Sequence, residues 1–285
     1  MHLNIINRKS PKDNFKEIWK KVEDFEEKRQ YLHQLIVTIS CDNNLFMSPI
    51  IKTKKNNKKY IKDYKLVLNL GSGYRIWSIC MTELYDDLVI IDIDIINYNE
   101  KISEPLIMFD NINLKIGKIN RINNSVDFIY QRDMIPVYED YEWDMLISEI
   151  YRILKNKGFV EIVEYDFIIE HTEKNKAFFT DIVVKCLIEI FRKNNHIYNI
   201  EKICYKLEKF FNKSKINIIK INLPLYFEDK FEGICIDNLL LGIKHIENTL
   251  ENITRKDFKE IVELLKQEWC INKSYIKLYI IYAQK

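Results

Sequence analysis

The chain has 285 residues, of which 47% are hydrophobic and 30% are charged, and this balance suits a globular protein with a sizeable buried core. Lysine and arginine number 44 against 42 aspartate and glutamate residues, so the net charge of +2 excludes a strong overall attraction to nucleic acid. No apolar run approaches the roughly 20 residues that cross a bilayer, and the N-terminal stretch lacks a secretory signal, so we expect no membrane segment.

The cysteines are spread singly along the chain. Six occur without a CxxC pair, at Cys41, Cys80, Cys186, Cys204, Cys235 and Cys270. This spacing argues against a zinc site and a disulfide framework, so we expect no metal. It favours a reducing compartment, which places the protein inside the cell, in the cytoplasm or the nucleus.

The first quarter of the chain predicts a helical extension. Residues 12–36 carry apolar side chains at intervals of three and four, and a polar break at 42–44 follows. Lys52–Lys62 then contains six lysines. It is typical of a solvated linker; a phosphate-binding patch is the alternative, without the arginines and aromatic residues that would strengthen it. We therefore expect residues 1–62 to form a helical extension that ends in a lysine-rich loop.

From Lys65 onwards, short apolar strands alternate with helices. The predicted elements are a strand at 66–70, a helix at 76–84, strands at 88–95, 112–116 and 126–130, a helix at 141–158 closed by Gly158, and a strand at 159–166. Apolar strands of this kind imply a parallel sheet with helices on both faces.

The second half of the chain is mostly helical. Helices are expected at 174–193, 201–213, 235–250 and 255–269, and strands at 215–225 and 274–284. Residues from about 170 to 213 would form a helical insert after the fifth strand. The last two strands are expected to pair antiparallel at one edge of the sheet.

A glycine turn separates the first strand from its helix, in the stretch "LVLNLGSGYRIW", Leu66–Trp77. In doubly wound sheets, ligands bind beyond the carboxyl ends of the strands, at the switch point after the first one. A dinucleotide fingerprint would need a third glycine where Ile76 stands, and no P-loop motif is present. Asp92, at the end of the second strand, can accept both hydrogen bonds of a ribose diol. Asp94 is a rival for that role, and a solvated strand end is the ordinary interpretation.

Two blocks of sequence carry a resemblance to a known family. "LNLGSGYRIWSICMTELYDDLVIIDIDI" and "NSVDFIYQRDMIPVYEDYEWDMLISEIYRILKNKGFVEIVEYD" resemble a class I S-adenosylmethionine-dependent methyltransferase. More narrowly, the chain is similar to the fungal branch that includes regulators of secondary metabolism. The branch motifs "FDFVHQR" and "RVLKPGGWIELMEYD" match Val126–Arg132 and Arg152–Asp166. Further likeness at "YLHQLIV", "IDNLLLGIK" and "YIIYAQK" extends over most of the chain.

The resemblance implies a Rossmann-like, seven-stranded methyltransferase sheet over residues 63–285, with the last strand antiparallel. S-adenosylmethionine would lie over the glycine loop, its ribose on Asp92 and its methionine part beside Gln131. The implied cofactor-binding residues are Asn69, Leu70, Gly71, Ser72, Gly73, Asp92, Ile93 and Gln131. Family members of this kind share no catalytic residue, so none is assigned.

Three positions depart from the family pattern. Asn69 replaces the acid before the first glycine, which keeps a hydrogen bond to the amino group of the cofactor but loses the charge. Arg75 replaces the third glycine; it would crowd the cofactor, turn harmlessly outward, or pair with the methionine carboxylate. Lys118 aligns with the acid that receives the adenine amino group, a bond that lysine cannot accept. A slip in the alignment would let Asp110 or Asp133 substitute.

Other polar residues have less specific interpretations. Glu161, Glu164 and Asp166 lie along the fifth strand and could bind a metal or act as a base, although a polar strand end is the ordinary interpretation. His171 could serve as a base near the methyl acceptor, and Tyr130 could line the cleft.

Two functions from different classes follow from these patterns. The first is methyl transfer to an unidentified small-molecule or protein acceptor. The alternative is a catalytically inactive pseudoenzyme that keeps the fold as a binding or regulatory module, motivated by Asn69, Arg75 and Lys118. A nicotinamide dehydrogenase would share Asp92 but fails the glycine spacing. The helical extension and the insert could form a lid or a surface for a protein partner.

Overall fold

The computed structural model describes residues 24–50, 64–98, 104–173, 175–196, 200–226, 230–244 and 255–285. These residues pack into two compact units. The first unit, which holds the glycine loop, comprises the described parts of Phe46–Ile168, Val184–Ile221 and Lys277–Lys285. The second comprises the described parts of Met1–Leu45, Ile169–Val183 and Asn222–Ile276. Lys52–Lys62 and the beginning of the helix expected at 12–36 lie outside the described residues.

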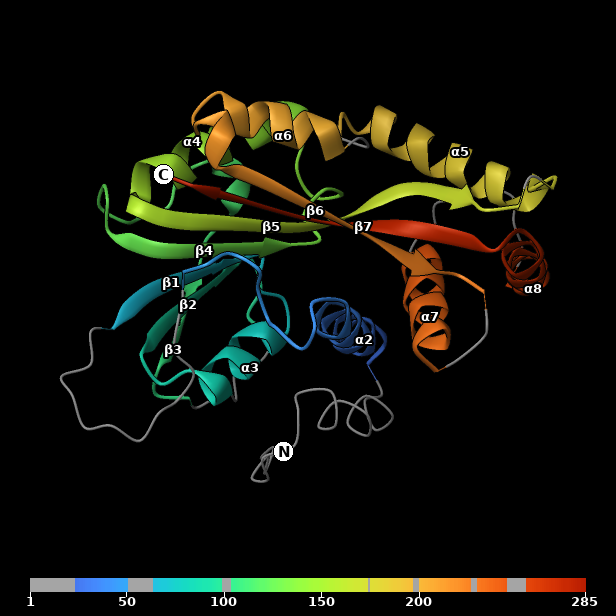
Figure 1. Cartoon of the computed structure of the whole chain (residues 1–285), viewed down its shortest axis with the longest axis horizontal. Coiled ribbons are helices and arrows are strands. Elements are labelled where there is room, and N and C mark those ends of the chain that lie inside the picture. The colour runs from blue at the N-terminus through green and yellow to red at the C-terminus, as the bar shows by residue number, and fades with distance from the viewer. Residues whose placement is uncertain are drawn as a thin grey trace. The chain divides into compact units, whose positions relative to one another are not determined.

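The strands form one seven-stranded sheet of order β3-β2-β1-β4-β5-β7-β6 (Figure 1). Their bounds, in the same order, are Ile107–Asn111, Leu88–Asp94, Lys65–Leu70, Val126–Arg132, Leu154–His171, Ser274–Gln284 and Ile216–Pro224. β1 to β5 are parallel, whereas β7 runs opposite to its neighbours and lies between β5 and β6. The predicted seven-stranded sheet and its antiparallel edge pair are confirmed.

The central strands are mostly apolar, which suits a sheet with both of its faces covered. Leu68 of β1 has Ile91 of β2 and Ile129 of β4 as its register partners, and all three side chains are buried. Such continuous burial is typical of a parallel sheet inside an α/β layer structure, and it explains why these strands are rich in apolar residues, with polar residues such as Asn69 and Asp92 towards their carboxyl ends.

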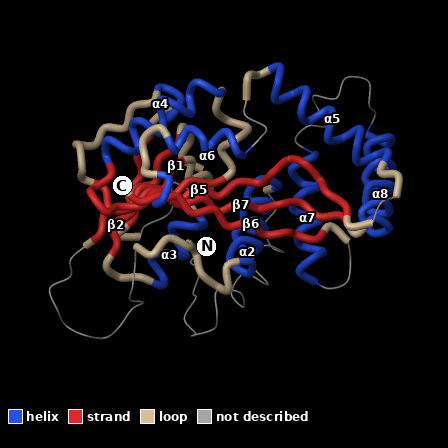
Figure 2. The backbone as a smooth tube through the Cα atoms, turned by 45° about the horizontal axis from the view of Figure 1, so that its top comes forward, coloured by secondary structure: helices blue, strands red, loops and turns tan. Residues whose placement is uncertain are grey.

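Helices cover both faces of the sheet in the first unit. α3 (Ile76–Leu84) lies on one face, and α4 (Asp140–Ile153) and α6 (Ile200–Glu208) lie on the other (Figures 1 and 2). Trp77 of α3 stacks on Tyr130 of β4, with ring centroids 4.1 Å apart and planes 2° apart. Tyr130 is therefore part of the core packing, and the interpretation that it lines a cleft was wrong.

The third strand lies upstream of its predicted position. It was expected at 112–116, but β3 occupies Ile107–Asn111, and the predicted segment contains a 3-10 turn at Leu114–Ile116. Asn113 begins that turn by accepting a hydrogen bond from the Lys115 amide, and Gly117 ends it with a φ of 62°. An Asn cap and a left-handed glycine outweigh the apolar alternation, which alone suggested a strand.

Helix α4 ends at Ile153, five residues before the predicted stop at Gly158. The residues in between form a bulge at the start of β5, because Val126 pairs with Leu154 while Phe128 pairs with Phe159. A Cβ at Gly158 would lie 3.0 Å from the Asp127 carbonyl oxygen. The glycine thus permits close backbone approach within the sheet.

The second unit is built on helix contacts. α2 (Phe25–Ser40) packs against α7 (Lys230–Lys244), where the Asn238 amide donates to the Arg29 carbonyl at 2.8 Å. Glu268 of α8 (Arg255–Asn272) accepts hydrogen bonds from the Thr180 amide and hydroxyl at the start of α5 (Phe178–Lys193). The helices predicted in the second half are thus present with shifted ends; residues 245–250 lie outside the described part.

Candidate functional site

The glycine loop joins β1 to α3 as a tight turn. Gly71 and Gly73 have φ values of 67° and 51°, a region that glycine enters without steric cost. The Gly71 and Ser72 amides donate to the Ile93 carbonyl at 2.8 and 3.2 Å, which fixes the loop against β2. Because α3 follows β1 on one face and α4 follows β4 on the other, the carboxyl ends of β1 and β4 form the switch point of the sheet.

Arg75, at the position of the family's third glycine, turns into the protein. Its backbone has a φ of 64° at the N-cap of α3, and the residue is 3% exposed. Its Nε donates to the Asp92 carboxylate at 2.7 Å, and its guanidinium carbon lies 5.6 Å from the centre of the Phe109 ring. The arginine is therefore committed to a buried ion pair within the sheet.

Asp92 lies at the centre of this buried polar cluster. Its Oδ1 accepts hydrogen bonds from the Asn69 amide at 2.9 Å and from the Ser78 hydroxyl, and its Oδ2 accepts the one from Arg75. The side chain is fully buried, which raises the pKa of the carboxyl, while the donors act in the opposite direction. Its carboxylate is closed off from solvent by this burial, which does not suit the expected role of binding a ribose diol.

Asp94, the last residue of β2, reaches the glycine loop instead. Its Oδ2 accepts a hydrogen bond from the Gly73 amide at 2.8 Å, and its Oδ1 accepts one from the Ile96 amide at 3.2 Å. The residue is half-buried, in contrast to Asp92. Of the two acids considered from the sequence, the structure brings Asp94 to the rim of the loop.

Gln131, at the carboxyl end of β4, pairs in register with Leu70, directly before the first glycine. It is fully buried, and neither its Oε1 nor its Nε2 has a hydrogen-bond partner among the described residues. The hydroxyl of Ser72 shares this condition. Buried polar atoms without partners are rare in native proteins, so these groups mark a place where a polar ligand would fit.

The remaining predicted cofactor residues support the loop from below. Leu70 and Ile93 are fully buried, so they contribute through their backbone. Asn69 is 4% exposed, and its Nδ2 donates to Ser78 and Asp92, so its amide belongs to the buried cluster.

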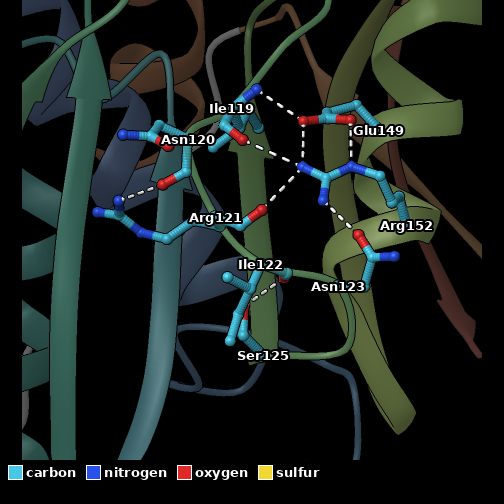
Figure 3. Close-up of polar contacts among 8 residues, drawn as sticks. All are labelled: Ile119, Asn120, Arg121, Ile122, Asn123, Ser125, Glu149 and Arg152. Atoms are coloured by element: carbon cyan, nitrogen blue, oxygen red, sulfur yellow. Dashed lines mark hydrogen bonds and ion pairs between the residues drawn. The ribbon is translucent and has the colours of Figure 1, made fainter.

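Lys118 lies exposed in the connection between the 3-10 turn and β4. The segment after it is clamped by two residues of α4 (Figure 3). Glu149 accepts the Ile119 amide at 2.8 Å, and Arg152 donates to the carbonyls of Ile119 and Arg121. β3 ends at Asn111, so Asp110 is the acid near the end of the third strand, and its carboxylate pairs with Arg121. Asp110 is one of the two alternatives to Lys118 considered from the sequence, and which residue would receive the adenine amino group stays a prediction.

The acids of β5 anchor neighbouring backbone. Glu161 accepts hydrogen bonds from the Met47 and Ser48 amides at 2.9 and 2.7 Å, and Glu164 accepts them from Met134 and Ile135 at 2.8 and 3.3 Å. Both glutamates are 1% exposed. In the described residues, no group of three or more His, Cys, Asp or Glu side chains is placed to hold a metal ion.

Glu161 makes stability depend on pH. Burial raises the pKa of its carboxyl from 4.5 to about 7, despite the opposing hydrogen bonds from the two amides. Between these two pH values the folded chain keeps the Glu161 carboxyl protonated, whereas the unfolded chain releases the proton. The free energy of unfolding should therefore fall by roughly 3 kcal/mol as the pH rises from about 4.5 to about 7. Above that range the loss is constant.

The variant Glu161→Gln should flatten this dependence. Urea unfolding of the wild type and the variant at several pH values between 4.5 and 8 measures it, with the exposed Glu208→Gln as control. Equal slopes in the wild type and in Glu161→Gln would show that Glu161 is ionised throughout.

His171 belongs to the second unit, where its Nδ1 lies 2.7 Å from the Ser274 hydroxyl. Its proposed role as a base stays a prediction. Throughout the described ranges, no helix combines the length and apolar character needed to cross a membrane.

Comparison with known proteins places the fold. No family model and no curated protein matches the chain. A protein assigned as a methyltransferase of an antibiotic biosynthesis pathway from Anabaena variabilis has a TM-score of 0.53 and 13% identity, over 79% of this chain and 92% of its own. A protein assigned as a sarcosine dimethylglycine methyltransferase from Galdieria sulphuraria has a TM-score of 0.50 and 12% identity, over 94% and 90%.

A third structure is phosphoethanolamine N-methyltransferase 2 of Haemonchus contortus, with a TM-score of 0.49 and 18% identity over 79% of this chain. This chain spans 50% of the length of that protein. At such identities the comparisons show the fold alone. The chain has the Rossmann-like fold of the class I methyltransferases, as the resemblance in its sequence implied.

Proposed function

We propose that the chain is an S-adenosylmethionine-dependent methyltransferase that acts on a small-molecule or protein acceptor. The observation that carries this proposal is the shape of the glycine loop at the switch point. Gly71 and Gly73 keep their positive φ values, and the Gly73 amide meets the Asp94 carboxylate at the rim. A loop of this kind, next to an acid that ends the second strand, is what a nucleoside with a ribose diol requires.

The residues around the loop fit such a cofactor. Asp94 offers a carboxylate to the ribose diol, which is the role first assigned to Asp92. The buried amide of Gln131 and the hydroxyl of Ser72 lack partners, and each could bind a polar group of the methionine part. Asn69, Leu70 and Ile93 shape the loop from beneath.

When bound, S-adenosylmethionine supplies an electrophilic methyl group on a sulfonium. The chain would hold the two reactants in line and exclude water between them. Such positioning lowers the activation barrier of transfers of this type. We assign no residue as a base.

Two of the three departures from the family pattern leave the loop intact. Arg75 is committed to Asp92, and Lys118 is exposed beyond the 3-10 turn, whereas Asp110 lies near the end of β3. The pseudoenzyme remains the second candidate. It is favoured by the neutral Asn69 and by Met134, whose side chain lies against Gly71. The narrower likeness to the fungal regulators, and a protein partner at the extension or insert, stay predictions.

Calorimetric titration of the purified chain with S-adenosylmethionine and S-adenosylhomocysteine tests the proposal. We expect dissociation constants in the micromolar range. No detectable heat at millimolar concentrations of either ligand would refute the enzyme and leave the binding module as the better account.

A further inference from the structure

A methionine lies against the glycine loop at the switch point. A Cβ built on Gly71 would lie 2.3 Å from the Sδ of Met134 and 2.8 Å from its Cε, so the thioether end of this side chain covers the open side of the glycine. Gly71 follows β1 and Met134 follows β4. The contact thus joins the two loops between which a ligand binds in a doubly wound sheet.

The backbone of Met134 is held by hydrogen bonds, while its side chain is flexible by its chemistry. Its carbonyl accepts hydrogen bonds from the Val137 and Tyr138 amides at 3.0 and 3.3 Å, and its amide donates to the buried Glu164 at 2.8 Å. The residue is only half-buried. Methionine has three rotatable bonds and no branch, so its end can move without disturbing this anchored turn.

Buried polar groups without partners occur near the end of β4, in the glycine loop and in the turn that follows Met134. They are the Gln131 amide, the Ser72 hydroxyl and the Tyr138 hydroxyl, none of which has a hydrogen-bond partner in the described part of the chain. Tyr138 is fully buried, and burial together with the charges of Glu164 and Asp94 raises its pKa well above the usual value.

We propose that Met134 is a displaceable plug, whose thioether takes the place over Gly71 that the methionine half of S-adenosylmethionine needs, and which swings aside when the cofactor enters. This inference rests on the proposed function and deepens it. The plug lowers the apparent affinity for the cofactor, because binding requires a side-chain arrangement that the contact with Gly71 disfavours. The partnerless amide and hydroxyls bind the cofactor once Met134 has moved.

Calorimetry with S-adenosylhomocysteine tests the plug on the full chain. We expect Met134→Ala to bind this ligand about tenfold more tightly than the wild type. Met145→Ala is the matched control, because Met145 also packs against a glycine of positive φ, Gly117, but on α4. Its affinity should equal that of the wild type. Equal or weaker binding by Met134→Ala would overturn the plug.

Carbon-13 labelling of the methionine methyl groups gives a second readout. The Met134 resonance, assigned by its absence in Met134→Ala, should shift on saturation with S-adenosylhomocysteine, whereas that of Met145 should stay in place. A Met134 resonance that does not move while the ligand binds would overturn the displacement.

Thermal melts test the contact itself without any ligand. Gly71→Ala should lower the melting temperature, and Met134→Ala should recover part of the loss in the double variant, because the new methyl group then meets open space. An unchanged loss in the double variant would show that the two residues do not touch. If neither the wild type nor Met134→Ala binds the ligand, the proposed function and the plug fall together; if both bind equally, only the plug falls.

Discussion

Replacing Asp92 with alanine should lower the free energy of unfolding by about 3–5 kcal/mol, as expected when one partner of a buried ion pair is removed. The substitution leaves the Arg75 guanidinium 4% exposed and without its carboxylate, and it also leaves Asn69 and Ser78 without their shared acceptor. Urea denaturation monitored by circular dichroism measures the loss.

A double variant tests the cause of this loss. In Arg75→Met/Asp92→Ala the unpaired charge is gone, so its destabilisation should be smaller than the sum of the two single effects. Asp144→Ala, in a partly exposed ion pair with Lys206 on the same unit, should cost less than about 1 kcal/mol. A loss of that small size for Asp92→Ala would mean that the Asp92 carboxylate does not stabilise the fold through Arg75. Asp92 would then again be a candidate to bind the ribose diol.

Asp94→Asn should weaken the binding of S-adenosylhomocysteine by about 10- to 100-fold. The amide oxygen of asparagine can still accept the Gly73 amide hydrogen, so the loop is expected to keep its shape. What is lost is the charge-assisted pairing with the ribose diol, worth about 1.5–3 kcal/mol. Calorimetry measures the change, with Asp144→Asn as a control of equal charge. Unaltered affinity in Asp94→Asn would place the diol elsewhere.

Much of the sheet could be predicted because its strands are governed by burial. Leu66–Leu70 and Val126–Tyr130 are each apolar at four of five positions and begin next to polar turns, so composition and length were sufficient. The third strand was misplaced because "INLKI" has the right alternation, while Asn113 and Gly117 have turn chemistry that decides locally. Gly158 was assigned to a helix end because a bulge in a sheet depends on the neighbouring strand, which the sequence does not reveal.

The candidate site could be located from the sequence but not resolved. Asp92 and Asp94 are two residues apart on one strand and share a face, so periodicity cannot tell them apart. The difference lies beneath the strand, where Ser78 and Arg75 engage Asp92. Met134 gave no signal at all, because its contact with Gly71 joins two loops that are distant in the sequence.

The pairing of Arg75 with Asp92 also restricts how this loop can change by single substitutions. A glycine at position 75 would relieve a left-handed backbone that costs roughly 1–2 kcal/mol for other residues. The same substitution would leave the Asp92 carboxylate buried without its arginine partner, at a larger cost in the free energy of unfolding. A variant with a neutral residue at position 92 suffers the reverse problem. We therefore expect a glycine at position 75 to be tolerated only if position 92 changes together with it.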